Sequence, residues 1–351
     1  MNLPETMSAL KLYAPGDIRF ETVPLPEYKP DEVLVEVKAC GVCGSDIPRL
    51  LTHGAHKADL IPGHEFSGVV AALGSEVDTV ALGQRVTAAP LIPCMKCQWC
   101  EKGHYSLCVS YDYLGSRSNG AMANYVRVPK ANLIPLPDAV SFEAGAMTDP
   151  AANAVHALGK AEIGPESVVA VFGVGPIGLF AVQLAKHLGA RTIIGVDVNA
   201  DKLALAKTAG ATDVVNSLEK EPAVAVREIA PGGADVILDA SGAPVAQHQC
   251  VLCAANHGVV IFLGISHAGL DLSEKAVDRI LRGELRIQGS WNSFSKPFPG
   301  REWTSSVELM EKGVFWNPAF ISHRLKLEDG PKFFADLARK RFPFDKIMFL
   351  P

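Results

Sequence analysis

Four closely spaced cysteines are the strongest chemical signal in the chain. They follow the spacing Cys94-x2-Cys97-x2-Cys100-x7-Cys108. Four thiolates at this spacing can close a tetrahedral shell around zinc without leaving an open position, which is typical of a structural site. The alternative is a pair of disulfides, but bridges in so tight a cluster would be strained. The pattern therefore predicts a structural zinc ion that stiffens its lobe and takes no part in catalysis.

A second signal is a glycine-rich turn between two apolar runs, 168–172 and 192–196. The turn opens a helical pattern, and Asp197 follows the second run. This order of strand, turn, helix, strand and acid is the dinucleotide-binding fingerprint. A parallel sheet with a glycine turn and no ligand is the alternative. The residues expected to surround the pyrophosphate are Gly173, which permits the tight turn, Gly175, which lets the phosphates approach the backbone, Pro176, Ile177, and Gly178, which allows close packing.

Asp197 lies about 20 residues beyond the turn, where the fingerprint places an acid that binds the ribose hydroxyls. A 2′-phosphate would meet a like charge there, so the sequence predicts NAD in preference to NADP. For Lys202, a few residues further on, two interpretations stay open: approach to the adenosine ribose, or a solvated position on a helix.

Length and composition describe an ordinary protein of two domains. The chain has 351 residues, 48% of them hydrophobic and 20% charged, and a formal net charge of -5. This balance, without a basic cluster, argues against nucleic-acid binding. No apolar run is long enough for a membrane span, and residues 1–10 resemble a short flexible leader rather than a secretory signal. We therefore expect a cytoplasmic protein with no membrane partner.

The hydrophobic pattern changes near the middle of the chain. Residues 11–141 show short strands separated by glycine turns, which indicates a β-rich, partly closed barrel. A helical stretch, 142–158, is expected to be interrupted at Pro150. Strands and helices then alternate to 289, which indicates a doubly wound parallel sheet. The tail is predicted to contain two helices and a last strand and to return to the first domain. The fold class is thus α/β, with a β-rich domain and a Rossmann domain.

Nearly the whole chain resembles the zinc-dependent medium-chain dehydrogenases, and within them the polyol branch. The resemblance rests on the four-cysteine lobe, the glycine turn and the segments 40–46, 63–68, 111–117 and 289–303. It implies a GroES-like catalytic domain over 1–153, an NAD-binding Rossmann domain over 154–290, and a return of 291–351 to the catalytic domain. It also implies a homo-oligomer, either a dimer or a tetramer.

The resemblance also implies a catalytic zinc site with an open position for the alcohol. Its expected ligands are Cys43, His64 and a carboxylate from Glu65 or Asp149. Many relatives have Glu at position 149, and the shorter Asp149 leaves Glu65 as the expected direct ligand. Ser45 is expected to accept a hydrogen bond from the alcohol proton and pass it on, by default to ribose hydroxyls or a water chain, with a local turn hydrogen bond as the alternative. The resemblance places Ser241, Leu263, Gly264, Ser290 and Trp291 beside the nicotinamide.

The implied reaction is oxidation of a secondary alcohol of a polyol or polyol phosphate by NAD, with galactitol 1-phosphate preferred. Arg49 or Arg117 is expected to bind the substrate phosphate or hydroxyls. The segment Asp149–His156 instead resembles enzymes that oxidise L-threonine, and a crystallin-type relative without catalysis is a third possibility. Cys250-x2-Cys253 is predicted to be a pair of buried thiols, and Cys40 another.

Overall fold

The computed structural model describes residues 3–340 and 344–351 and divides the chain into two compact units. Unit 1 comprises the residues up to Asp149 together with Phe294–Glu311 and Ile321–Pro351. Unit 2 comprises Pro150–Ser293 and Lys312–Phe320. No helix in the described part of the chain is long and apolar enough to cross a bilayer.

Unit 1 is built on a seven-stranded sheet. In order across the sheet, its strands are β16 (Ile321–Leu325), β17 (Lys346–Phe349), β3 (Glu32–Val42), β4 (Glu65–Leu73), β5 (Arg85–Ala88) and β9 (Leu133–Pro135), while β8 (Tyr125–Pro129) also pairs with β3. Val33, Val35 and Val37 of β3 are all buried, as their alternation predicts. They belong to an apolar core that reaches from Met7 to Phe349.

Smaller elements complete unit 1. They are the strand pairs β1 (Thr6–Ala14) with β2 (Asp17–Pro24) and β6 (Leu91–Ile92) with β7 (Asp112–Tyr113), and the helices α1 (Asp46–Pro48), α2 (Gln98–Glu101), α3 (Phe142–Ala146), α10 (Arg301–Glu311) and α11 (Gly330–Lys340). The prediction of a flexible leader is wrong for residues 6–10, because these residues form about half of β1. Met7, Ala9 and Leu10 point into the core, and this burial stabilises the strand.

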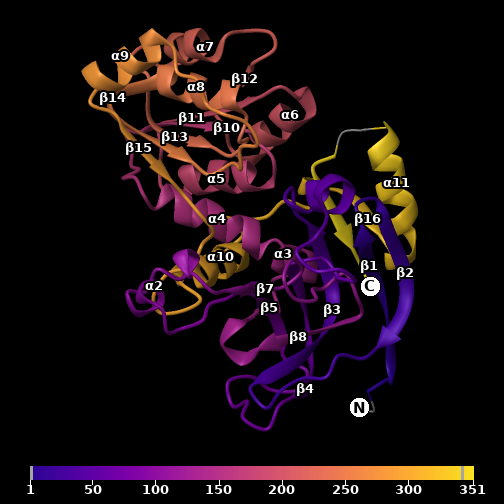
Figure 1. Cartoon of the computed structure of the whole chain (residues 1–351). Coiled ribbons are helices and arrows are strands. Elements are labelled where there is room, and N and C mark those ends of the chain that lie inside the picture. The colour runs from indigo at the N-terminus through magenta and orange to yellow at the C-terminus, as the bar shows by residue number, and fades with distance from the viewer. Residues whose placement is uncertain (1–2, 341–343) are drawn as a thin grey trace. The chain divides into compact units, whose positions relative to one another are not determined.

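Unit 2 is a doubly wound sheet of six parallel strands, as the alternation predicts. Its order is β12 (Asp213–Asn216), β11 (Thr192–Asp197), β10 (Val168–Phe172), β13 (Ala234–Asp239), β14 (Ala254–Phe262) and β15 (Arg286–Gly289). Helices α5 (Pro176–His187) and α6 (Ala200–Ala209) pack together, and α7 (Pro222–Ile229), α8 (Pro244–Cys253) and α9 (Glu274–Arg282) form a second row (Figure 1). The strand order reverses between β10 and β13, which is where such folds bind ligands.

The helical stretch before β10 is interrupted at a different residue from the one expected. Helix α3 ends at Ala146 and α4 (Thr148–Leu158) begins two residues later, so the break falls at Met147. Pro150 instead lies in the first turn of α4. A proline is tolerated there because the first N–H groups of a helix have no intrahelical partner.

The tail differs from the prediction in two respects. It contributes two strands to unit 1, β16 and β17, rather than one. In addition, Lys312–Phe320 packs with unit 2. The rings of Phe315 and Phe320 lie 5.2 and 5.8 Å from that of Phe180 on α5, and this aromatic contact explains why the short segment leaves unit 1.

Candidate metal centres and cofactor site

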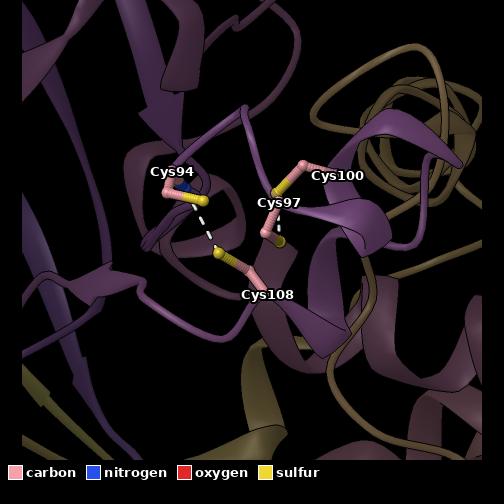
Figure 2. A group of neighbouring side chains, drawn as sticks. All are labelled: Cys94, Cys97, Cys100 and Cys108. Atoms are coloured by element: carbon pink, nitrogen blue, oxygen red, sulfur yellow. Dashed lines mark hydrogen bonds between the residues drawn. The ribbon is translucent and has the colours of Figure 1, made fainter.

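The four cysteines of the lobe converge on one point. Their sulfur atoms all lie within 4.8 Å of one another and turn toward a shared space (Figure 2). Cys100 and Cys108 are buried, and no disulfide joins the four. Backbone N–H groups of Cys100 and Val109 lower the pKa of Cys97 to about 6, which favours the thiolate that binds a metal. A donor set of four thiolates around one centre fits a closed zinc site.

Sheet pairing in unit 1 assembles a second cluster. Cys43 follows the end of β3, His64 precedes β4, and Gly41 of β3 pairs with Glu65 of β4. The two strands are antiparallel, so the end of one lies beside the start of the other. As a result, ligand atoms of Cys43, His64 and Glu65 all lie within 4.8 Å of one another. A thiolate, an imidazole and a carboxylate fit a catalytic zinc site, because three protein ligands leave the fourth coordination position unassigned.

A buried carboxylate orients the imidazole of this cluster. Asp46 Oδ1 lies 3.5 Å from His64 Nδ1, which leaves Nε2 as the ring atom available to a metal. The same carboxylate pairs with Arg49 at 2.6 Å and accepts the backbone N–H of Cys43 at 3.2 Å. Burial would lower the pKa of His64, but the charges of Asp46 and Cys43 raise it well above the ordinary value. Asp46 is not among the residues predicted from the sequence, although its spacing of three residues before Arg49 is a local signal for this ion pair.

A buried lysine neutralises Glu65. Lys346, the first residue of β17, forms an ion pair with Glu65 Oε2 and donates to the carbonyl of Val42 at 3.1 Å. Gly41 leaves room for this carboxylate, because a Cβ there would lie 2.5 Å from Glu65 Oε2. Burial would lower the pKa of Lys346, but the charge of Glu65 raises it. Local sequence gives no signal for this pair.

Asp149 and Ser45 lie in the same unit. Asp149 is only 6% exposed, and burial raises the pKa of its carboxyl to about 7 while the charge of His64 opposes the rise. The group of mutually close ligand atoms contains Glu65 and not Asp149, as expected from the shorter side chain. The Ser45 side chain makes no capping hydrogen bond to helix α1.

The two arginines predicted to bind substrate have different surroundings. Arg49 forms an ion pair with Asp46, and its side chain is only 19% exposed. Arg117 is exposed at the tip of a tight loop whose N–H groups bond back to Tyr113. Its guanidinium lies 4.5 Å from the centre of the Tyr111 ring. Tyr111 in turn contacts Tyr113, whose ring lies 5.5 Å from that of His64. The structure thus leaves Arg117 exposed and available to an anion.

The glycine turn of unit 2 has the geometry of the fingerprint. Gly173 has a φ of +84°, and a Cβ on Gly178 would lie 2.1 Å from the carbonyl oxygen of Gly173. A Cβ on Gly175 would meet no atom within 4 Å, so the space above the start of α5 is open. Helix α5 begins with Pro176 and Ile177. Its N-cap residue is Gly175, so no side-chain cap satisfies the first N–H groups of the helix. Open space at a helix N-terminus fits a pyrophosphate.

Asp197 ends β11 beside this turn. Its Oδ2 accepts the N–H of Val174 at 3.0 Å, and its Oδ1 accepts those of Val198 and Asn199 at 2.8 and 3.0 Å. The carboxylate is partly exposed, so it can also accept from a ribose hydroxyl. Lys202 is half-buried on α6.

The remaining predicted residues follow the ends of β13, β14 and β15, at the carboxyl edge of the sheet. Ser241 and Trp291 are exposed, Leu263 and Gly264 are half-buried, and Ser290 is 5% exposed. The thiols Cys40, Cys250 and Cys253 are all fully buried in apolar cores, as predicted. They are structural.

Comparison with known proteins identifies the class. Residues 29–138 match the alcohol dehydrogenase GroES-like domain, and residues 176–312 match the zinc-binding dehydrogenase family. The chain belongs to the zinc-binding dehydrogenases and is an oxidoreductase that acts on small molecules, which excludes the crystallin-type alternative.

Individual relatives fall in more than one branch. The chain is 36% identical to galactitol 1-phosphate 5-dehydrogenase of Escherichia coli, over 96% of this chain and 97% of the relative. It is 37% identical to L-threonine 3-dehydrogenase of Symbiobacterium thermophilum, over 82% and 83%. A crystal structure of galactitol-1-phosphate dehydrogenase from E. coli superposes with a TM-score of 0.93, at 36% identity over 98% and 100% of the two chains. The resemblance to the polyol branch is thereby confirmed.

Proposed function

We propose that this protein oxidises a secondary alcohol of a polyol phosphate to a ketone with NAD. The observation that carries the proposal is the group of Cys43, His64 and Glu65, whose ligand atoms lie within 4.8 Å of one another in unit 1. Such a set binds zinc and leaves a position for the alcohol oxygen. When bound, zinc lowers the pKa of the alcohol and NAD accepts the hydride.

The chain's own residues have defined tasks in this proposal. Cys43, His64 and Glu65 hold the metal, and Asp46 fixes the ring of His64. Lys346 occupies one oxygen of Glu65 and leaves the other for the metal. The hydroxyl of Ser45, which does not cap helix α1, accepts a hydrogen bond from the alcohol and passes a proton on to a ribose hydroxyl or a water chain.

The dinucleotide is assigned to the carboxyl edge of the sheet in unit 2. Its pyrophosphate binds at Gly173–Gly178, its adenosine ribose at Asp197 with Lys202 nearby, and its nicotinamide beside Ser241, Leu263, Gly264, Ser290 and Trp291. The carboxylate of Asp197 already accepts three backbone N–H groups, so its negative charge is fixed where a 2′-phosphate would have to lie. This geometry favours NAD. We also propose a cytoplasmic location and a homo-oligomer.

Galactitol 1-phosphate is the preferred substrate, because the galactitol 1-phosphate 5-dehydrogenase of E. coli matches almost the full chain and Arg117 offers a guanidinium to a phosphate. L-threonine is the second candidate, supported by the threonine dehydrogenase that matches 82% of the chain. The test is NADH formation with galactitol 1-phosphate, galactitol, sorbitol and L-threonine as separate substrates. Activity with L-threonine alone would overturn the proposed substrate, and activity with none of the four would overturn the polyol class.

Arg117 tests whether the phosphate itself is recognised. Replacing Arg117 with Ala should raise KM for galactitol 1-phosphate about tenfold, as expected for loss of a charge-assisted contact. KM for free galactitol should not change, because it has no phosphate to lose. Arg191→Ala, which removes an exposed arginine from unit 2, is the matched control. An equal effect on both substrates would show that Arg117 does not bind the phosphate.

A further inference from the structure

Three loops of unit 2 meet backbone to backbone where β10, β13 and β14 end. A Cβ on Gly173 would lie 2.8 Å from the nitrogen of Ser241. One on Gly264 would lie 2.0 Å from the nitrogen of Gly242, and one on Gly242 would lie 2.3 Å from the carbonyl oxygen of Ile265. No side chain fits between these loops, so the position of each depends directly on its neighbours.

A single buried residue lies at the centre of this junction. Asp239, the last residue of β13, is 0% exposed. Its Oδ1 accepts the N–H of Ser241 at 2.9 Å, the hydroxyl of Ser241 at 2.6 Å and the N–H of Gly242 at 3.1 Å. Its Oδ2 accepts Nε2 of Gln247 at 3.1 Å. The side chain therefore holds the loop after β13 to its own strand.

The main chain of Asp239 holds the next loop. Its carbonyl oxygen accepts the N–H groups of Leu263 and Gly264, both at 2.9 Å. Among residues 3–340 and 344–351, no cation pairs with the carboxylate. An ionised group so deeply buried is stable only if it is fully hydrogen-bonded, and here the donors are loop N–H and O–H groups and one amide. The hydrogen bonds that stabilise the carboxylate of Asp239 thus also hold these loops in their conformation.

The junction lies at the reversal of strand order between β10 and β13. Doubly wound sheets bind their dinucleotides across this point. The glycine turn lies on one side of it, and the loops at 241–242 and 263–264 lie on the other. A ligand that spans both sides requires the two sets of loops to keep a fixed separation.

We propose that Asp239 is a positioning residue for the dinucleotide. It does not touch the cofactor; it holds the loops after β13 and β14 against the glycine turn. The inference rests on the proposed function, because the ligand is NAD. It differs from a general stabilising role in its consequence: weakening this anchor should impair cofactor binding more than it impairs folding or the affinity for the alcohol.

Asp239→Asn is the variant that separates these roles. The amide keeps an oxygen for Ser241 and Gly242, and Gln247 can turn its own amide over to accept from the new NH2 group. The shape is retained, but a neutral acceptor replaces a charged one and binds the donors about half as strongly. Fluorescence titration with NADH should show a dissociation constant raised about tenfold. KM for the alcohol at saturating NAD and the urea midpoint of unfolding should change little.

Asp235→Asn is the matched control. Asp235 lies at the other end of β13, and its carboxylate accepts the N–H of Val168 at 2.8 Å. This variant should bind NADH as the unchanged protein does. Gln247→Leu, which removes the 3.1 Å contact with Asp239 Oδ2 at a residue that does not border the nicotinamide, gives a second measurement if Asp239→Asn does not fold, and should weaken NADH binding by about threefold.

The outcomes are distinguishable. If the unchanged protein does not bind NADH, the proposed function fails. If it binds NADH and Asp239→Asn, or Gln247→Leu in its place, binds equally well, the positioning role is overturned. A parallel loss of stability, alcohol affinity and NADH affinity would also overturn it, because that is the behaviour of a merely structural residue.

Discussion

The buried amine of Lys346 donates a hydrogen bond to Glu65, 281 residues earlier in the chain. The two side chains are 3% and 2% exposed. The pair forms because β17 returns to lie beside β3, while β4 pairs with β3 on the other side. The end of the chain thereby supplies the counter-charge for a carboxylate at the candidate catalytic zinc site.

Replacing Lys346 with Met should therefore be strongly destabilising. The change removes the buried cation that pairs with Glu65, and the free energy of unfolding should fall by about 3 kcal/mol. Urea denaturation measures this loss. Lys38→Met is the matched control, since its pair with Glu36 is 37% and 38% exposed, and it should cost about 0.5 kcal/mol. Equal losses in the two variants would contradict the prediction.

The sequence predicted unit 2 more fully than unit 1 for a physical reason. In unit 2 each strand, turn and helix carries its own periodicity, and Gly173–Asp197 encodes the ligand turn within one supersecondary unit. In unit 1 the important relationships are between distant segments. Glu65 and Lys346 each look like a surface charge when read locally, and only the pairing of β17 with β3 brings them together.

Two other differences have local causes. Residues 6–10 were expected to belong to a flexible leader, yet pairing with β2 and burial of Met7 and Leu10 make them a strand. The break at Met147 was missed because Pro150 is the more conspicuous residue, although a proline in a first turn does not end a helix. The residue roles at both metal centres and at the cofactor site stay predictions that the experiments must test.

Loss of one thiolate should open the four-cysteine lobe. Cys100→Ser removes a ligand that is only 5% exposed. The zinc content found by metal analysis should fall from about two ions per chain to about one. The thermal midpoint should fall as well, because structural zinc contributes directly to folding. Cys253→Ser is the control: it changes an equally buried thiol that belongs to the core of unit 2 and should leave the metal content unchanged. A change in zinc content with Cys253→Ser would contradict the assignment.

Asp197 should control the choice of dinucleotide. In Asp197→Ala the repulsion of a 2′-phosphate disappears, and the contacts of the carboxylate with Val174 and Asn199 disappear with it. We expect kcat/KM for NAD to fall at least tenfold, and the preference for NAD over NADP to fall by about a hundredfold. Asp201→Ala, which changes an exposed acid four residues away, should alter neither. A preference retained in Asp197→Ala would assign the discrimination to other residues.

The outer edge of the sheet in unit 2 should form the contact between copies of this chain. Strand β15 is the last in the sheet, and most of its residues are exposed, in contrast to those of β12 at the opposite edge. An uncovered edge strand readily pairs with another strand. Ile287 on β15 is 38% exposed. Pairing of two such edges would cover this side chain.

Ile287→Glu should therefore dissociate the oligomer, because it would place like charges together in the contact. Sedimentation equilibrium should give a mass near 37.4 kDa for this variant and a multiple of it for the unchanged protein. Leu218→Glu, at a side chain 77% exposed just beyond β12, tests the other edge and should leave the oligomer intact. If Leu218→Glu dissociates the protein and Ile287→Glu does not, the contact lies at β12 instead, and the exposure of β15 has some other cause.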